Sequence, residues 1–175
     1  SGDGGGNSGI TFTTAKTTSA TGTSGFSWTT HSWDNGFPLI QDTVLIPNAF
    51  TAGQTVSINC VRPGKNIIFS CTGSPTLSSG FSFGSTVNMY GSLDLTGVGS
   101  VSASWLTLVM RGRGSYTITS SISMRATTID APGGTYTFNS APTWIAALVL
   151  NNGTINDNSQ NTTITTFACT TTTAG

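Results

Sequence analysis

Few residues of this chain could act as acids or bases, and their arrangement does not favour catalysis. All six acidic residues are aspartates. A glycoside hydrolase needs two carboxyl groups about 5 to 10 Å apart. Asp94, Asp130 and Asp157 are the candidates, but their spacings do not follow the twenty-residue repeat described below, which aligns Asp130 with Leu150. The sequence Asp130-Ala131-Pro132-Gly133 is also typical of a turn. We expect no catalytic residues.

The single histidine, His31, and the three cysteines do not form a recognisable site either. His31 precedes Asp34 by three residues in a turn-rich stretch, so we expect a local hydrogen bond rather than a triad. The cysteine spacings match no zinc motif, and we expect small buried side chains. A bridge between Cys60 and Cys71 of neighbouring coils, or a metal site, is the alternative. We expect no metal and no cofactor. The cysteines are Cys60, Cys71 and Cys169.

One aromatic-rich stretch contains residues that could bind a ligand. Residues 26–38 contain Trp28, His31, Trp33 and Phe37, which could contact a sugar or a receptor. The alternative is that these side chains cover the end of the core.

Two further pairs could contact a ligand or a partner. Arg111 and Arg113 could hold an anion or bridge two subunits. Ile10 and Phe12 alternate with polar residues, so this segment could add a strand to the edge of another subunit.

The composition narrows the classes of partner. Only 7% of residues are charged and the net charge is zero, whereas soluble domains average roughly 25% charged residues. We therefore expect no binding to nucleic acid or to an anionic membrane. A weakly charged surface protects poorly against association, so either partner chains bury much of it or hydroxyl groups keep the chain in solution.

A repeat indicates the architecture that positions these residues. Residues 114–133 align with residues 134–153 at an offset of twenty, with apolar positions largely retained. Short strand patterns separated by glycine indicate an all-β chain. We predict a right-handed parallel β-solenoid with coils of about 15–20 residues, in which Tyr116 stacks on Tyr136, Ile118 on Phe138 and Met124 on Trp144. A jelly roll or other β-sandwich is the alternative.

The predicted organisation is one β-helix domain preceded by an arm. Residues 1–25 are rich in glycine, serine and threonine and are expected to be flexible or docked to a partner. Within 26–175 we expect an N-terminal cap at 26–41, stacked coils at 42–165 and a tail at 166–175.

Two segments resemble a known group of proteins. Residues 133–165, GGTYTFNSAPTWIAALVLNNGTINDNSQNTTIT, look like β-helix repeats of phage tail fibres and appendages, and residues 42–59 are similar to the opening coil of such proteins. The resemblance implies a virion surface protein, a homotrimer or higher assembly, with other virion proteins as partners and a host-surface glycan as a further candidate.

Three functions follow in order of preference. The first is a non-enzymatic structural protein of a phage virion, such as a tail-fibre-like, decoration or appendage subunit. The second is a bacterial extracellular filament or adhesin at the cell surface. The third is a β-helix enzyme that degrades polysaccharides.

Overall fold

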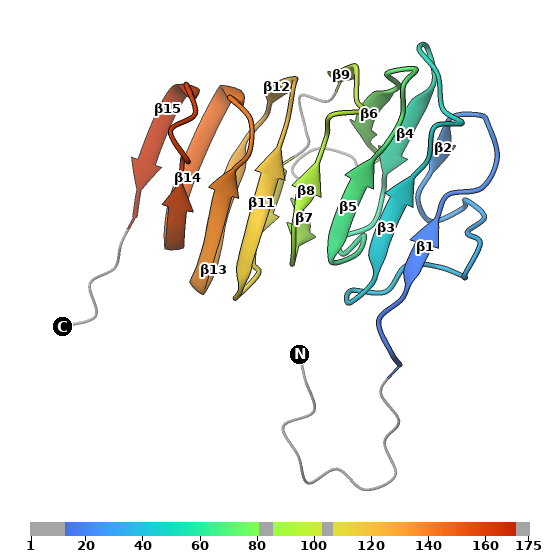
Figure 1. Ribbon diagram of the computed structural model, residues 1–175, viewed down its shortest axis with the longest axis horizontal. Helices are drawn as coiled ribbons and strands as arrows, with labels where there is room; N and C mark the ends of the chain where they lie inside the picture. Colours follow the sequence, from blue (N-terminus) through green and yellow to red (C-terminus); the bar gives the residue numbers. More distant parts are fainter. Residues whose placement is uncertain (1–12, 81–85, 103–106, 171–175) are drawn as a thin grey trace, which may run out of the picture.

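The chain folds into a β-solenoid of about 6 coils. The computed structural model describes residues 13–80, 86–102 and 107–170, and no helix occurs among them. No helix able to cross a membrane is therefore present in this part of the chain. Strands stack side by side along the long axis, from β1 at one end to β15 at the other (Figure 1). The predicted all-β solenoid is confirmed.

The described residues form fifteen strands. The strands of the first coils are short, and the last three strands are long. They are β1 (Thr17–Ser19), β2 (Phe26–Ser27), β3 (Thr43–Ile46), β4 (Thr55–Ile58), β5 (Asn66–Phe69), β6 (Thr76–Ser79), β7 (Thr86–Met89), β8 (Leu93–Asp94), β9 (Ser100–Val101), β10 (Thr107–Met110), β11 (Ser115–Thr119), β12 (Ser123–Met124), β13 (Thr127–Phe138), β14 (Thr143–Asn156) and β15 (Thr163–Cys169). Since β1 already belongs to the stack, the first coil begins before residue 25, inside the segment expected to be an arm.

The strands pair as expected for stacked coils and not as hairpins. One sheet has 11 strands and contains the path β1-β3-β5-β8-β11-β13-β10-β7, with β12, β14 and β15 joined beside it; a second sheet has the order β2-β4-β6-β9. Every pairing between these strands is parallel. Parallel neighbours need a crossover connection, which here is the rest of a coil. The antiparallel sandwich considered from the sequence does not describe this molecule.

The twenty-residue repeat corresponds to one coil. Tyr116 pairs with Tyr136 and Ile118 with Phe138 between β11 and β13, while Met124 pairs with Trp144 between β12 and β14. These predicted stacks are confirmed.

The repeat does not hold along the whole chain. Between β13 and β14 the register shifts, and Asp130 pairs with Asn152 rather than with Leu150. Residues 130–133, expected to form a turn, instead lie inside β13, where the register with β14 is irregular and Gly133 has a φ of 73°. Earlier coils are longer than predicted: Thr17 pairs with Thr43, twenty-six residues later.

Alternating burial places one column of apolar side chains in the centre of the solenoid. In β3 and β5 the pattern along the strand is intermediate, buried, intermediate, buried. Each of these coils contributes one apolar residue, which pairs with the equivalent residue of the next coil. The side chains of this column are almost completely buried. The column is Val44, Ile67, Leu93, Ile118 and Phe138. Burial of each such side chain contributes about 1.5–3 kcal/mol.

Adjacent isoleucines in β5 test this inward and outward alternation. Ile67 is fully buried, whereas Ile68 is only partly buried. We expect Ile67→Ala to lower the free energy of unfolding by about 2–5 kcal/mol, because it leaves a cavity in the column. Ile68→Ala, the matched control, should cost less than about 1.5 kcal/mol. Urea unfolding followed by circular dichroism measures both, and equal losses would contradict the assigned facing of β5.

Candidate functional site

The aromatic stretch that could have contacted a ligand lies largely inside the N-terminal end of the solenoid. Trp28 is 0% exposed and Trp33 is 9% exposed, with their ring centroids 5.0 Å apart. Phe26 packs between them and His31, whose ring stacks on Phe26 at 3.8 Å. The two tryptophans therefore offer little surface to a sugar. Phe37, at 43% exposure, is the accessible member of the stretch.

Asp34 covers the free edge of the first strand and does not act with His31. Its carboxylate accepts hydrogen bonds from the Ser19 backbone N–H at 2.7 Å and from the Thr18 hydroxyl at 3.3 Å. These bonds, the one from Ser19 first, hold the pKa of Asp34 below its ordinary value. An antiparallel bridge between Ala20 and Trp33 covers the same edge. The N-terminal edge of the sheet is thereby blocked against further pairing.

The remaining candidate catalytic groups lie apart. Asp94 accepts hydrogen bonds from Thr96, and Asp157 accepts one from the Ser159 backbone N–H at 3.3 Å. In the described residues no group of three or more His, Cys or Asp side chains could hold a metal ion. All three cysteines are free thiols. Cys71 is buried as expected, but Cys169 is exposed at the end of β15.

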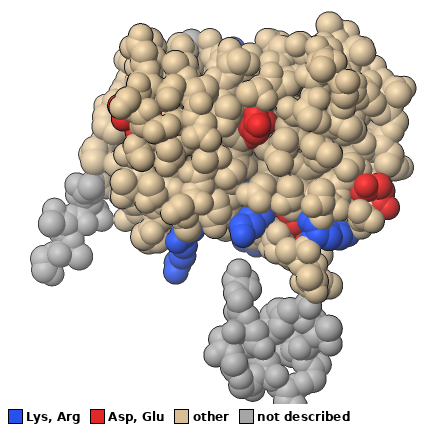
Figure 2. All heavy atoms as spheres, in the orientation of Figure 1, with Lys and Arg blue, Asp and Glu red and all other residues tan. Residues whose placement is uncertain are grey.

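Lysine and arginine gather where coils turn from one face to the next. Figure 2 shows blue atoms along the lower edge of a surface that is otherwise almost uncharged. A hollow of about 630 Å³ lies here, which we name the basic corner groove. Its polar and aromatic lining is Gln41, Lys65, Tyr90, Arg111, Arg113 and Tyr116, and Thr13, Ala15, Ile40 and Gly112 complete it.

Glycine shapes the floor of the basic corner groove. A Cβ atom on Gly112 would overlap the ring of Tyr116 and the carbonyl oxygen of Tyr90. Without side chains at this corner, the Tyr116 ring can lie against the backbone of the coil before it. Tyr136 lies behind Tyr116, with ring centroids 5.6 Å apart, and its hydroxyl accepts a hydrogen bond from the Gly112 N–H at 3.0 Å. Burial raises the pKa of Tyr136 to about 12.

The charges in the basic corner groove are unequally neutralised. Arg111 donates from Nη1 to Asp130 at 2.6 Å and from Nε to Asn88 at 2.6 Å, so its guanidinium is held in place. Lys65 instead lies over the Tyr116 ring, with Nζ 5.9 Å from the ring centroid. Arg113 is exposed. Among the described residues, neither Lys65 nor Arg113 forms an ion pair.

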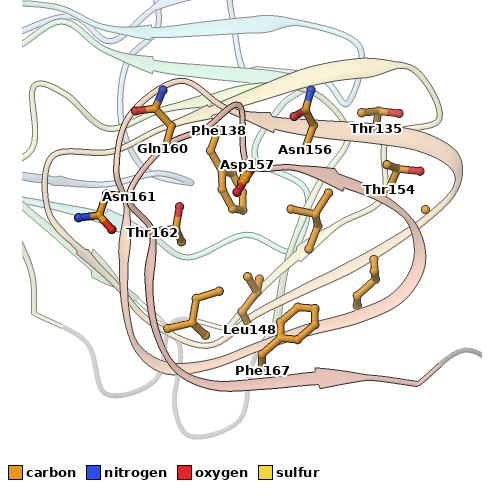
Figure 3. A pocket seen from close by; sticks show the side chains of 14 residues that line it. Thr135, Phe138, Leu148, Thr154, Asn156, Asp157, Gln160, Asn161, Thr162 and Phe167 are labelled. Atoms are coloured by element: carbon orange, nitrogen blue, oxygen red, sulfur yellow. The ribbon is translucent and has the colours of Figure 1, made fainter.

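The C-terminal end of the solenoid is hollow and open, unlike the N-terminal end. Strand β15 pairs only with β14, so its other edge has no partner among the described strands. A hollow of about 910 Å³ lies inside the last coils. Figure 3 shows Leu148 and Phe167 at one side of the space that these coils enclose, and Phe138, Asp157 and Gln160 towards the other side. Phe167 is 53% exposed, the highest value for a large apolar side chain in the described residues.

Sequence reasoning identified part of these surfaces. It selected Arg111 and Arg113, which the structure places in the basic corner groove. It missed Lys65, Tyr90 and Tyr116, which come from different coils and converge only through the stacking. Phe167 was assigned to the tail at 166–175, although its place in an Ile-Thr-Thr-Phe sequence is a strand signal. Ile10 and Phe12 lie outside the described residues.

Comparisons with known proteins add no functional information. No protein-family model, no curated protein and no solved structure matches this chain.

His31 predicts a pH dependence of stability. Burial lowers its pKa from 6.5, and a hydrogen bond with the backbone of Thr21 opposes this only partly. Because the unfolded chain then binds the proton more readily, the free energy of unfolding should fall as the pH drops below about 6.5.

The variant His31→Gln should remove this slope, since no other histidine is present. Urea unfolding at pH 7.5, 6.5 and 5.5 measures it in both proteins. Protonation of Asp34 affects the free energy of unfolding only at pH values below about 3.8, outside this pH range. An unchanged slope in the variant would refute the assignment to His31.

Proposed function

We propose that this chain is a non-enzymatic structural protein that acts by assembly, as a subunit of a virion appendage such as a phage tail fibre or a capsid decoration. The observation that carries the proposal is the asymmetry of the two ends. The N-terminal edge is blocked by Asp34 and Trp33, whereas at the C-terminal edge β15 has no second partner among the described strands and borders a hollow with apolar and polar lining. An unprotected edge strand is a template for pairing with another chain.

The occupant that we propose for this edge is the N-terminal segment of a second copy. Ile10 and Phe12 alternate with threonine, which matches a strand that directs two apolar side chains towards the hollow. The segment carries no charge between residues 4 and 15, and no charged residue other than Asp157 lines the hollow. Residues 13 and 15, which follow this segment in the sequence, are exposed.

The observations that support a non-enzymatic role concern the aspartates. Asp34 and Asp42 bind backbone N–H groups, and Asp130 binds Arg111 and Asn152. These contacts give the three carboxylates roles in holding the backbone and a corner of the solenoid, which supports a structural rather than a catalytic use.

A bacterial extracellular filament is the second candidate, and the same asymmetry favours it. Contact between unlike surfaces of identical subunits gives an open filament when the rotation between them does not close a ring. Electron microscopy of the assembled protein distinguishes the two, because a filament lengthens with concentration whereas an appendage subunit forms a closed oligomer of fixed size.

Removing the apolar character of the open end should abolish assembly. We expect the full chain to have a mass that is a multiple of 17.9 kDa, and Phe167→Asp to shift it to 17.9 kDa, because a carboxylate would have to be buried in the hollow. Val61→Asp is the matched control, since Val61 is an exposed apolar residue at 49% that lies away from this end. Light scattering after size exclusion measures the masses. A monomeric full chain would refute the assembly proposal.

A second pair of variants tests the occupant. Ile10→Asp with Phe12→Asp should give monomers, because both apolar contacts with the hollow are lost. Gly9→Asp with Thr11→Asp adds the same charge at alternate positions and should leave the assembly intact, since these side chains would face away from the hollow. Equal behaviour of the two double variants in sedimentation velocity would exclude the N-terminal segment as the occupant.

A further inference from the structure

We propose that the basic corner groove binds an anionic polysaccharide, with Lys65 and Arg113 holding its sulfate or carboxylate groups and Tyr116 packing against a sugar ring. This site is distinct from the open C-terminal end. No residue lines both this groove and the hollow at the C-terminal end.

Positive charge is concentrated in the basic corner groove of a nearly uncharged protein. Three of the six lysines and arginines line this one groove. Of these, only Arg111 is neutralised by an ion pair among the described residues. The nearby Asp42 is buried, and its carboxylate accepts hydrogen bonds from the backbone N–H groups of Lys16 and Leu39. The groove therefore presents positive charge to a ligand.

Aromatic surface lies beside this charge. Tyr90 and Tyr116 are both partly exposed in the groove. The C–H face of a pyranose ring packs on an aromatic ring, and the tyrosine hydroxyl remains available to a sugar hydroxyl. Lys65, which lies over Tyr116, can reach an acidic substituent of a sugar that packs on the same ring.

The basic corner groove is already formed in the unliganded chain. Tyr136 and Gly112 support the Tyr116 ring from behind, and Asp130 and Asn88 fix Arg111. Side chains held in place lose less conformational entropy when a ligand binds. A volume of about 630 Å³ is within the range of small-ligand sites.

A nucleic acid is the less suitable anion for this surface. Its affinity comes mainly from many phosphate contacts along a basic stripe, whereas this chain has zero net charge and one short basic groove. A polysaccharide presents acidic groups together with apolar ring faces, which the groove can accommodate within a few residues.

Binding to four defined probes tests the proposal. The probes are a heparin hexasaccharide, a galacturonate hexamer, a neutral cellohexaose and a hexameric oligothymidylate, each measured by isothermal titration calorimetry at 50 mM salt. We expect at least one of the two acidic saccharides to bind, and the pair to show whether sulfate or carboxylate is preferred. Cellohexaose should bind at least about tenfold more weakly, because it lacks the charged hydrogen bonds.

Charge-matched variants locate the site. Lys65→Gln and Arg113→Gln should each raise the dissociation constant about tenfold, and Tyr116→Leu should weaken binding of the acidic saccharides. Arg62→Gln removes an exposed charge outside the groove and should change the constant less than about twofold. Circular dichroism checks that each variant is folded. The assembly-deficient Phe167→Asp variant should bind as the parent does, which separates this site from the proposed interface.

Three results would overturn the proposal. One is that neither acidic saccharide binds. Another is that oligothymidylate binds as tightly as the better saccharide. The third is that Arg62→Gln weakens binding as much as Lys65→Gln, which would indicate attraction to net charge rather than to a built site.

Discussion

The structure depends on the parallel stacking of coils, because each residue lies beside its equivalent in the next coil rather than beside an unrelated partner. Polar side chains outside the core also join neighbouring coils. The Asn66 amide donates a hydrogen bond to the Thr43 hydroxyl at 3.1 Å and accepts one from the Ser92 backbone N–H at 2.9 Å. Uncharged side chains suit such columns, since like charges on adjacent strands repel. The low content of charged residues, 7%, follows from this constraint.

The same constraint explains where the charges are found. A corner has fewer equivalent side chains above and below it than a strand has, because glycine occupies positions such as Gly91 and Gly112, where a Cβ would overlap the neighbouring coil. Lys65, Arg111 and Arg113 occupy this corner without forming a column of equal charges. The surface therefore has two features of different chemistry. The basic corner groove carries positive charge, and the hollow beside β15 is lined by uncharged side chains and Asp157.

The sequence carried enough information for the fold and for part of each surface. The alignment of Tyr116 with Tyr136 and of Met124 with Trp144 predicted the stacking correctly, because packing in the core repeats from coil to coil. The longer coils near Thr17 could not be predicted, since insertions outside the strands leave no periodic signal. The groove also escaped prediction, because Lys65 and Tyr116 become neighbours only once three coils have stacked. Exposure of Cys169 and Phe167 depends on where stacking ends, which the local pattern does not specify.

The separation between stacked residues has a consequence for folding kinetics. Hydrogen bonds that join neighbouring coils link residues about equally far apart along the chain, such as 26 residues for Lys16 and Asp42 and 20 for Ser120 and Ser140. Each coil that docks therefore closes a loop of similar length, and the entropy of closure changes little from one step to the next. Once two coils have formed a nucleus, the others can add in sequence. A longer array of such coils would then need more steps but no slower individual step.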